Sequence, residues 1–61
     1  MKNNLYDTVR SLTNRDQVNK GDEGTIVEIW QNGEYYEVEF LGKDGKTIGL
    51  LTMREGEFEK V

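Results

Sequence analysis

The sequence contains no cysteine, no histidine and no proline among its 61 residues. Without cysteine or histidine, the chain has neither a disulfide framework nor a thiolate or imidazole metal site. Catalytic arrangements built on a histidine base, such as Ser-His-Asp or Cys-His, are excluded for the same reason. A domain this small buries only about 60% of the surface that its unfolded chain exposes. We therefore expect one domain over residues 1–61 with a single small core, and neither a cofactor nor a catalytic residue.

Long apolar runs are also missing. No stretch reaches the roughly 18 consecutive apolar residues that a membrane span needs, and the N-terminal "MKNNLYDTVR" lacks the apolar run typical of a signal peptide. These features favour a cytoplasmic protein. Twelve acidic and eight basic side chains give a net charge of −4, which disfavours a polyanionic partner.

What the sequence does contain is a series of strand-like segments separated by glycine turns. "GTIVEIW" and "YYEVEFL" flank "QNGE", and Asn-Gly between two such runs is a strong hairpin signal. One face of this hairpin is apolar, which agrees with the register that the turn predicts. The predicted pairs are Trp30–Tyr35, Ile29–Tyr36, Glu28–Glu37, Val27–Val38 and Thr25–Phe40.

"LGKDGKTIGLLTM" indicates a second hairpin, with a three-residue loop at 43–45 and Gly45 in the left-handed conformation. A two-residue turn would shift the register by one residue and place Gly49 and Leu51 inside. That alternative is disfavoured because a glycine would then occupy a core position. The predicted pairs are Phe40–Ile48 and Val38–Leu50.

The remaining segments complete a small β-fold. "LYDTVRSL", residues 5–12, is expected to form the first strand, followed by a polar loop in which Val18 is the apolar anchor. After a turn or a short helical turn over 53–57, Phe58 and Val61 are expected to close the core. Five short strands and no long helix predict an all-β, five-stranded SH3-like barrel or partly open roll. The predicted core consists of Val9, Val27, Ile29, Tyr36, Val38, Phe40, Ile48, Leu50 and Phe58.

The segment "GDEGTIVEI", residues 21–29, resembles the KOW-type segment of SH3-like barrels. Over nearly the whole chain, "LYDTVRSL", "KGDEGTIVEI", "YEVEFLGKDGKTIGLLTM" and "FEKV" resemble an uncharacterised bacterial and cyanobacterial family of small SH3-like proteins. The resemblance implies a compact β-barrel with no established activity and no known site residues. It also implies genes that lie beside those of toxin-like proteins, and hence the role of a neutralising partner.

The glycine loop allows two interpretations. Gly21 and Gly24 either expose backbone N–H groups to phosphate or RNA, or permit a turn or bulge at the entry to a bent strand. Asp22 and Glu23 lie between the glycines and would repel a polyanion. The structural interpretation is therefore favoured, and nucleic acid is disfavoured as a partner. The basic residues that would have to converge on this loop are Arg10, Arg15 and Lys20.

The predicted outer face of the hairpin is the best candidate for a binding surface. Alternation places Trp30 beside Tyr35, with Ile26, Leu51 and Met53 also on that side, and large contiguous apolar patches are rare on monomers. Tryptophan and tyrosine are enriched at the hot spots of protein interfaces. Alternatively, the terminal strands cover this face, or a strong bend moves Ile26 into the core. The candidate protein-binding residues are Trp30, Tyr35, Glu28, Glu37, Glu39, Leu51 and Met53.

The three glutamates of that set also allow alternatives. A partner with a basic surface would neutralise them, or else water and Lys46 screen them. Two carboxylates can act as the acid–base pair of a glycosidase, but a barrel this small offers no deep cleft. The expected function is a non-catalytic, acidic protein-binding module that is a monomer or a weak homo-oligomer. The alternatives are an accessory subunit of a larger complex and a KOW-like, nucleic-acid-associated module.

Overall fold

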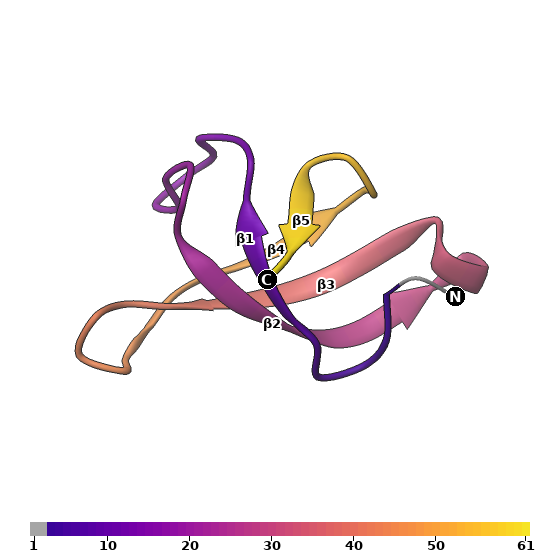
Figure 1. The fold of residues 1–61 in the computed structure, drawn as a ribbon, viewed down its shortest axis with the longest axis horizontal. Helices are drawn as coiled ribbons and strands as arrows, with labels where there is room; N and C mark the ends of the chain where they lie inside the picture. Colours follow the sequence, from indigo (N-terminus) through magenta and orange to yellow (C-terminus); the bar gives the residue numbers. More distant parts are fainter. Residues whose placement is uncertain (1–2) are drawn as a thin grey trace.

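The computed structural model describes residues 3–61, so the first two residues of the predicted 1–61 domain lie outside it. Five antiparallel strands form one open, strongly bent sheet in the order β4-β3-β2-β1-β5 (Figure 1). The predicted all-β fold is confirmed. No helix in this part of the chain is long and apolar enough to cross a membrane. The elements are β1 (Thr8–Ser11), β2 (Glu23–Trp30), the 3-10 turn η1 (Gln31–Gly33), β3 (Tyr35–Leu41), β4 (Thr47–Met53) and β5 (Phe58–Lys60).

The β2–β3 hairpin follows the predicted register only near its turn. The pairs from Trp30–Tyr35 to Glu28–Glu37 are confirmed, but the register then shifts between Ile26 and Glu28. This β-bulge adds one residue to β2 and increases its twist, which bends the strand. The predicted pairs Val27–Val38 and Thr25–Phe40 are therefore wrong. The observed pairs beyond the bulge are Ile26–Val38, Thr25–Glu39 and Gly24–Phe40.

The β3–β4 hairpin has the predicted loop but a different register. The Gly42 N–H donates to the Lys46 carbonyl at 2.7 Å, and Gly45 has a φ of 82°. A second irregularity then makes Ile48 an extra residue, because Leu41 pairs with Thr47 while Phe40 pairs with Gly49. The predicted pairs Phe40–Ile48 and Val38–Leu50 are therefore wrong, and Val38 pairs with Leu51.

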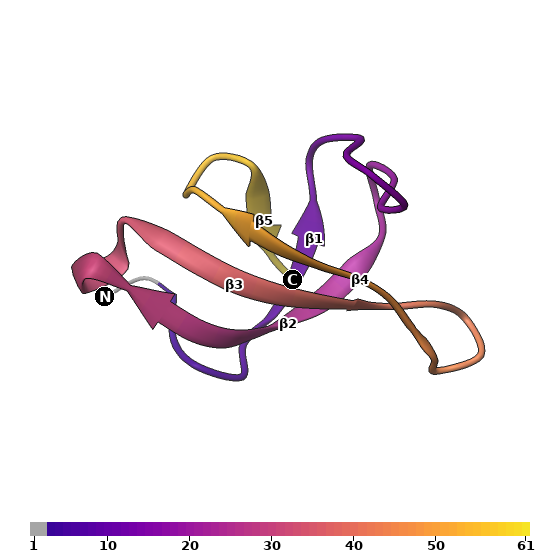
Figure 2. The same cartoon turned by 180° about the vertical axis from the view of Figure 1, so that it is seen from behind.

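A contact from a distant loop explains why a glycine is accepted at this inner position. A Cβ atom built on Gly49 would lie 3.1 Å from Cγ2 of Val18, so the missing side chain leaves the room that Val18 fills. Val18 is fully buried, as its role of loop anchor requires. The loop end of the β3–β4 hairpin extends beyond the rest of the sheet (Figures 1 and 2).

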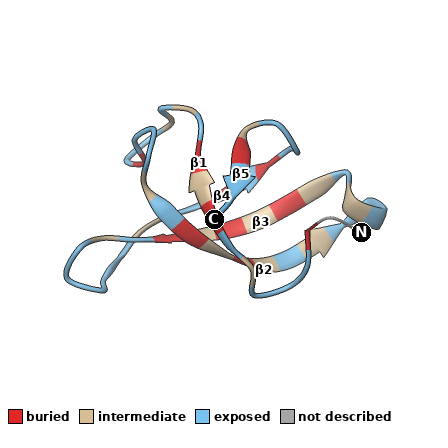
Figure 3. Cartoon of the chain, in the orientation of Figure 1, coloured by how far each residue is buried: buried red, intermediate tan, exposed pale blue. Residues whose placement is uncertain are grey.

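The core contains buried residues from all five strands (Figure 3). Its centre includes an edge-to-face pair between Tyr36 and Phe58, with ring centroids 5.2 Å apart. Ile29 and Ile48 are only partly buried against it, whereas the predicted core members Val27 and Leu50 lie outside it. The buried hydrophobic residues are Val9, Val18, Ile26, Tyr36, Val38, Phe40, Leu51, Met53 and Phe58.

The chain termini also differ from expectation. The first strand is shorter than predicted, because residues 4–7 form a turn in which the Asp7 N–H donates to the Asn4 carbonyl at 3.2 Å. Of the two forms expected for residues 53–57, the structure has the turn and not the helical turn, because the Glu57 N–H donates to the Arg54 carbonyl at 3.0 Å. Val61 is 58% exposed and does not close the core.

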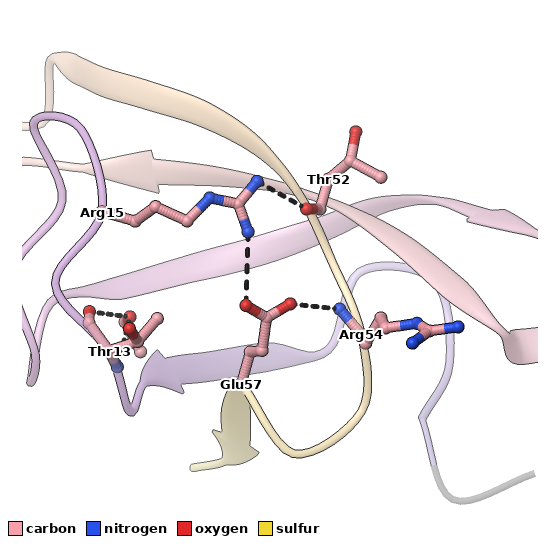
Figure 4. A network of polar contacts seen from close by, with 6 residues as sticks. Thr13, Arg15, Thr52, Arg54 and Glu57 are labelled. Carbon is pink, nitrogen blue, oxygen red and sulfur yellow. Dashed lines mark hydrogen bonds and ion pairs between the residues drawn. The ribbon is translucent and has the colours of Figure 1, made fainter.

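The Arg15 side chain bridges the open side of the sheet, where β4 and β5 share no ladder in the described chain. Its guanidinium donates to the Thr52 carbonyl of β4 at 2.9 Å and lies 3.3 Å from the Glu57 carboxylate (Figure 4). The second oxygen of Glu57 accepts the Arg54 N–H at 2.8 Å. One side chain thereby ties the β1–β2 loop to β4 and to the turn before β5.

Candidate protein-binding surface

The face of the β2–β3–β4 sheet opposite the core is here named the outer face. Because Tyr36, Val38 and Phe40 are buried on the core side, alternation places their neighbours in β3 on the other side. Leu51 and Met53 are only 5% and 0% exposed, so they belong to the core and not to this surface. The outer face consists of Glu28 and Trp30 of β2, Tyr35, Glu37 and Glu39 of β3, and Leu50 and Thr52 of β4.

The aromatic end of the outer face lies next to the η1 turn. Trp30 pairs with Tyr35 and is 48% exposed. The Arg54 guanidinium lies over the Tyr35 ring, 5.1 Å from its centroid, and 3.5 Å from the Glu34 carboxylate. This cation–π contact occupies one side of the Tyr35 ring. Trp30 is therefore the aromatic side chain that is open to a partner.

The turn beside Trp30 has an unusual backbone. Gln31, Asn32 and Gly33 have φ values of 51°, 58° and 94°, so three consecutive residues lie in the left-handed region. Asparagine and glycine tolerate this region, but for glutamine it is uncommon. The Glu34 N–H donates to the Trp30 carbonyl at 3.2 Å and to that of Gln31 at 3.3 Å, and these bonds close the turn.

Three carboxylates form a row along the middle of the outer face. Glu28 lies opposite Glu37, as predicted, and such a like-charge pair costs roughly 0.2–1 kcal/mol. Hydroxyl groups of β4 hold two of the three: Thr52 donates to Glu37 at 2.6 Å and Thr47 donates to Glu39 at 3.0 Å. These bonds orient the carboxylates without neutralising them. Within residues 3–61, none of the three forms an ion pair, with Lys46 or with any other cation.

Within residues 3–61, at least five other carboxylates lie beside a cation. Both sides of each of these pairs are partly exposed, so each contributes at most about 1 kcal/mol. The side-chain hydrogen bond from Arg10 to Glu59 raises the pKa of Arg10 above its ordinary value. The pairs are Arg10 with Glu59 at 3.0 Å and Glu23 at 3.5 Å, Arg15 with Glu57 at 3.3 Å, Arg54 with Glu34 at 3.5 Å, and Lys60 with Asp7 at 3.3 Å.

The glycine loop has structural reasons for both of its glycines. Gly21 has a φ of 97° and donates its N–H to the Ser11 carbonyl at 2.8 Å, so this N–H is already used within the fold. Gly24 is buried in β2, where a Cβ atom would lie 2.6 Å from the carbonyl oxygen of Glu39. Of the cations expected near this loop, Arg10 and Arg15 are each paired with carboxylates. The loop thus provides a turn and a close strand contact.

An open depression of about 280 Å³ lies where β1, β2 and the end of β3 meet. Its lining contains one carboxylate, that of Glu23, which is paired with Arg10. This lining offers no acid–base pair. Among residues 3–61, no group of three or more carboxylates is arranged to hold a metal ion. The lining residues are Thr8, Glu23, Gly24, Thr25, Leu41 and Gly42.

Sequence reasoning located five of the seven candidate residues on the outer face and misplaced Leu51 and Met53. It missed Leu50, which is 56% exposed, and Arg54, which covers Tyr35. The alternative register of the second hairpin would have placed Leu50 correctly. No local signal in the sequence pointed to Arg54.

Comparison with known proteins gives one match. The family described as "Domain of unknown function (DUF4926)" matches residues 5–60, a range that includes all five strands and the whole outer face. Neither the curated proteins nor the solved structures contain a match to the chain. Because the matched range covers nearly the entire chain, the protein belongs to the DUF4926 family.

Proposed function

We propose that the protein is a non-catalytic module that binds another protein through its outer face. The observation that carries the proposal is the row formed by Glu28, Glu37 and Glu39, which has no cation within residues 3–61 while five carboxylates elsewhere do. An exposed tryptophan beside uncompensated charge suits a partner with a basic surface and an apolar pocket. Trp30 would enter that pocket, and the carboxylates would accelerate encounter and fix orientation.

A more specific version concerns the fold type and the biological role. The strand order and the long, bent β2 support an SH3-like arrangement of the sheet. The resemblance to bacterial proteins encoded beside toxin-like neighbours supports a neutralising partner as the role. In that role the basic partner is the toxin-like protein, and the outer face covers part of its surface.

The test is affinity capture with matched variants. The wild type, Trp30→Ala and a triple variant with glutamine at the three acidic positions are immobilised and exposed to lysate of the source organism at low and high salt. Leu12→Ala is the control, because Leu12 is 39% exposed and lies outside the outer face. Thermal unfolding of each variant confirms that it is folded.

We expect the wild type and Leu12→Ala to retain a basic protein at low salt, and the other two variants to lose it. Mass spectrometry identifies the retained protein, and mixing the purified pair tests direct binding. Equal retention by all four proteins, or retention that does not depend on salt, would show that the outer face is not the binding surface.

A further inference from the structure

The two edges of the sheet differ in a way that points to a binding mode. The edge strand β5 has only three residues, and two of them, Glu59 and Lys60, are charged. The edge strand β4 has seven residues, Thr47–Met53, and none is charged. Natural sheets protect their edges with charge, proline or short strands, because an open edge pairs with other chains. Of the two edges, β5 is protected in this way and β4 is not.

The backbone of β4 presents hydrogen-bonding groups at this edge. The Thr52 carbonyl accepts its bond from Arg15, which approaches from outside the β3–β4 ladder. In an antiparallel ladder the N–H and C=O of one residue point to the same side, and alternate residues point to opposite sides. Leu50, two residues before Thr52, therefore directs its N–H and C=O to the open edge. Arg15 covers the end of β4 at Thr52, so the open part is residues 47–51.

The side chains around this open part indicate what it would pair with. Leu50 is 56% exposed and offers an apolar contact. Glu39 pairs with Leu50 and Glu37 with Thr52, so two carboxylates without a cation lie one strand inside the edge. A strand added outside β4 would lie about 10 Å from β3, two strand spacings away. A lysine or arginine side chain spans that distance when a glutamate extends toward it.

We propose that the open edge of β4 accepts an extended basic segment of the partner protein as a sixth strand. The inference rests on the proposed function and specifies how the partner is bound, by main-chain pairing at Leu50 together with charge pairing at Glu37 and Glu39. A second copy of this chain is disfavoured as the occupant, because each copy carries a net charge of −4 and two paired β4 edges would bring the same carboxylates close together. The segment would carry an apolar residue beside Leu50 and basic residues two positions away on either side.

Amide hydrogen exchange at Leu50 tests this mode directly. The probe is the peptide acetyl-Thr-Lys-Thr-Val-Thr-Lys-Thr-amide, added to the ¹⁵N-labelled protein at low salt. The control probe is the same peptide with an N-methyl group on the central valine, which keeps the charges and removes one main-chain donor. The Leu51 amide is the internal control, because Leu51 pairs with Val38 in the free protein.

We expect the first peptide to slow exchange of the Leu50 amide by about tenfold or more, as pairing of an open amide does. The N-methyl peptide should bind more weakly and leave Leu50 unprotected, and Leu51 should remain slow throughout. Peptide binding that shifts the Trp30 signals without protecting Leu50 would refute strand addition and leave the proposed function standing. Absence of binding at millimolar peptide would also refute it. Protection of Leu50 in the concentrated free protein would identify a second copy as the occupant and overturn the proposal.

A pair of charge variants tests the same mode on the natural partner. Leu50→Lys places a cation at the open edge, while Leu12→Lys places the same charge on a leucine that is 39% exposed and lies outside the outer face. We expect Leu50→Lys to reduce capture of the partner by about tenfold, and Leu12→Lys to change it by about twofold or less. Equal effects of the two variants would show that charge alone matters and would contradict edge pairing. Capture lost with Trp30→Ala but retained with Leu50→Lys would leave the proposed function intact without strand addition.

Discussion

Replacement of Gly24 by alanine is the change that the fold should tolerate least. The new Cβ atom would lie 2.6 Å from the carbonyl oxygen of Glu39, 2.9 Å from Cδ1 of Phe40 and 3.0 Å from Cγ1 of Val38. The two side chains can rotate away, but the carbonyl belongs to the β2–β3 ladder, in which Glu39 pairs with Thr25. The methyl group is therefore accommodated only if the two strands separate.

The expected cost of Gly24→Ala can be compared with the total stability. Overpacking of a closely packed site costs about 1–3 kcal/mol and occasionally more, and we expect at least the upper value because the obstacle is backbone. A domain of this size has a free energy of unfolding of roughly 3–9 kcal/mol. A loss of about 3 kcal/mol corresponds to a fall in Tm of roughly 12–24 °C. The variant should therefore be largely unfolded in mild denaturant.

Gly21→Ala is the matched control within the same loop. Gly21 has a φ of 97°, but a Cβ atom there would have no heavy atom within 4 Å outside its own neighbours. This variant should lose only the strain of a left-handed alanine, about 1–2 kcal/mol. Urea unfolding followed by fluorescence of the single tryptophan, Trp30, measures both variants. If Gly24→Ala retained stability within about 1 kcal/mol of the wild type, or were more stable than Gly21→Ala, the close-contact argument would be refuted.

Three further predictions concern the register of β4, the Arg15 contacts between β4 and the turn before β5, and the loss of stability at low pH. Leu51→Ala should lower the free energy of unfolding by about 2–5 kcal/mol and Leu50→Ala by less than about 0.5 kcal/mol, because only Leu51 is buried. Urea unfolding measures both variants, and a larger loss for Leu50→Ala would contradict the observed register. Arg15→Lys should cost about 1 kcal/mol, since one ammonium cannot reproduce both guanidinium contacts, and it should accelerate amide exchange at Glu57 more than at Val38. The hydrogen bond from the Asn4 N–H, and to a smaller extent the charge of Lys60, hold the pKa of Asp7 below its ordinary value of 3.8. The stability that the ionised Asp7 contributes is therefore present above about pH 4 and lost as the pH falls through the folded pKa. Asp7→Asn should make the free energy of unfolding depend less steeply on pH in this acidic range, which a pH series of urea unfolding curves measures.

The sequence was sufficient for the hairpins but not for the register of their strands. Asn-Gly and the Lys-Asp-Gly loop are local signals, and both turns formed where they were predicted. Each hairpin then contains a bulge, and a one-residue shift exchanges the two faces of a strand. Alternation could not detect the bulges, because Ile26 and Val27, and likewise Leu50 and Leu51, place an apolar residue on both faces. The deciding contact between Gly49 and Val18 joins segments that are far apart in the sequence.

The candidate surface was predicted where it depended on local geometry. Trp30, Tyr35, Glu28 and Glu37 lie within the part of the hairpin whose register is set by the turn, and they share the outer face as expected. Leu51 and Met53 lie on the strand whose register was shifted by the second bulge. Their removal from the surface changes its chemistry, since Leu50 replaces Leu51 and Met53 as the apolar residue that β4 contributes to the outer face.

The distribution of ion pairs explains how a moderate net charge becomes a local field. Arg10 is paired with Glu23 and Glu59 across the two ladders of β1. The other paired cations of residues 3–61 are Arg15 between β4 and the turn before β5, Arg54 beside Glu34 at the η1 end of the β2–β3 hairpin, and Lys60 beside the turn at residues 4–7. Because these cations are engaged by other carboxylates, none of them neutralises Glu28, Glu37 or Glu39. Under the proposed function, a basic partner would be attracted to the outer face, and this attraction should weaken as salt shortens the range of the field. Glu37 and Glu39 lie one strand from the open edge of β4, so under the two proposals the charge that guides encounter would also favour pairing at that edge.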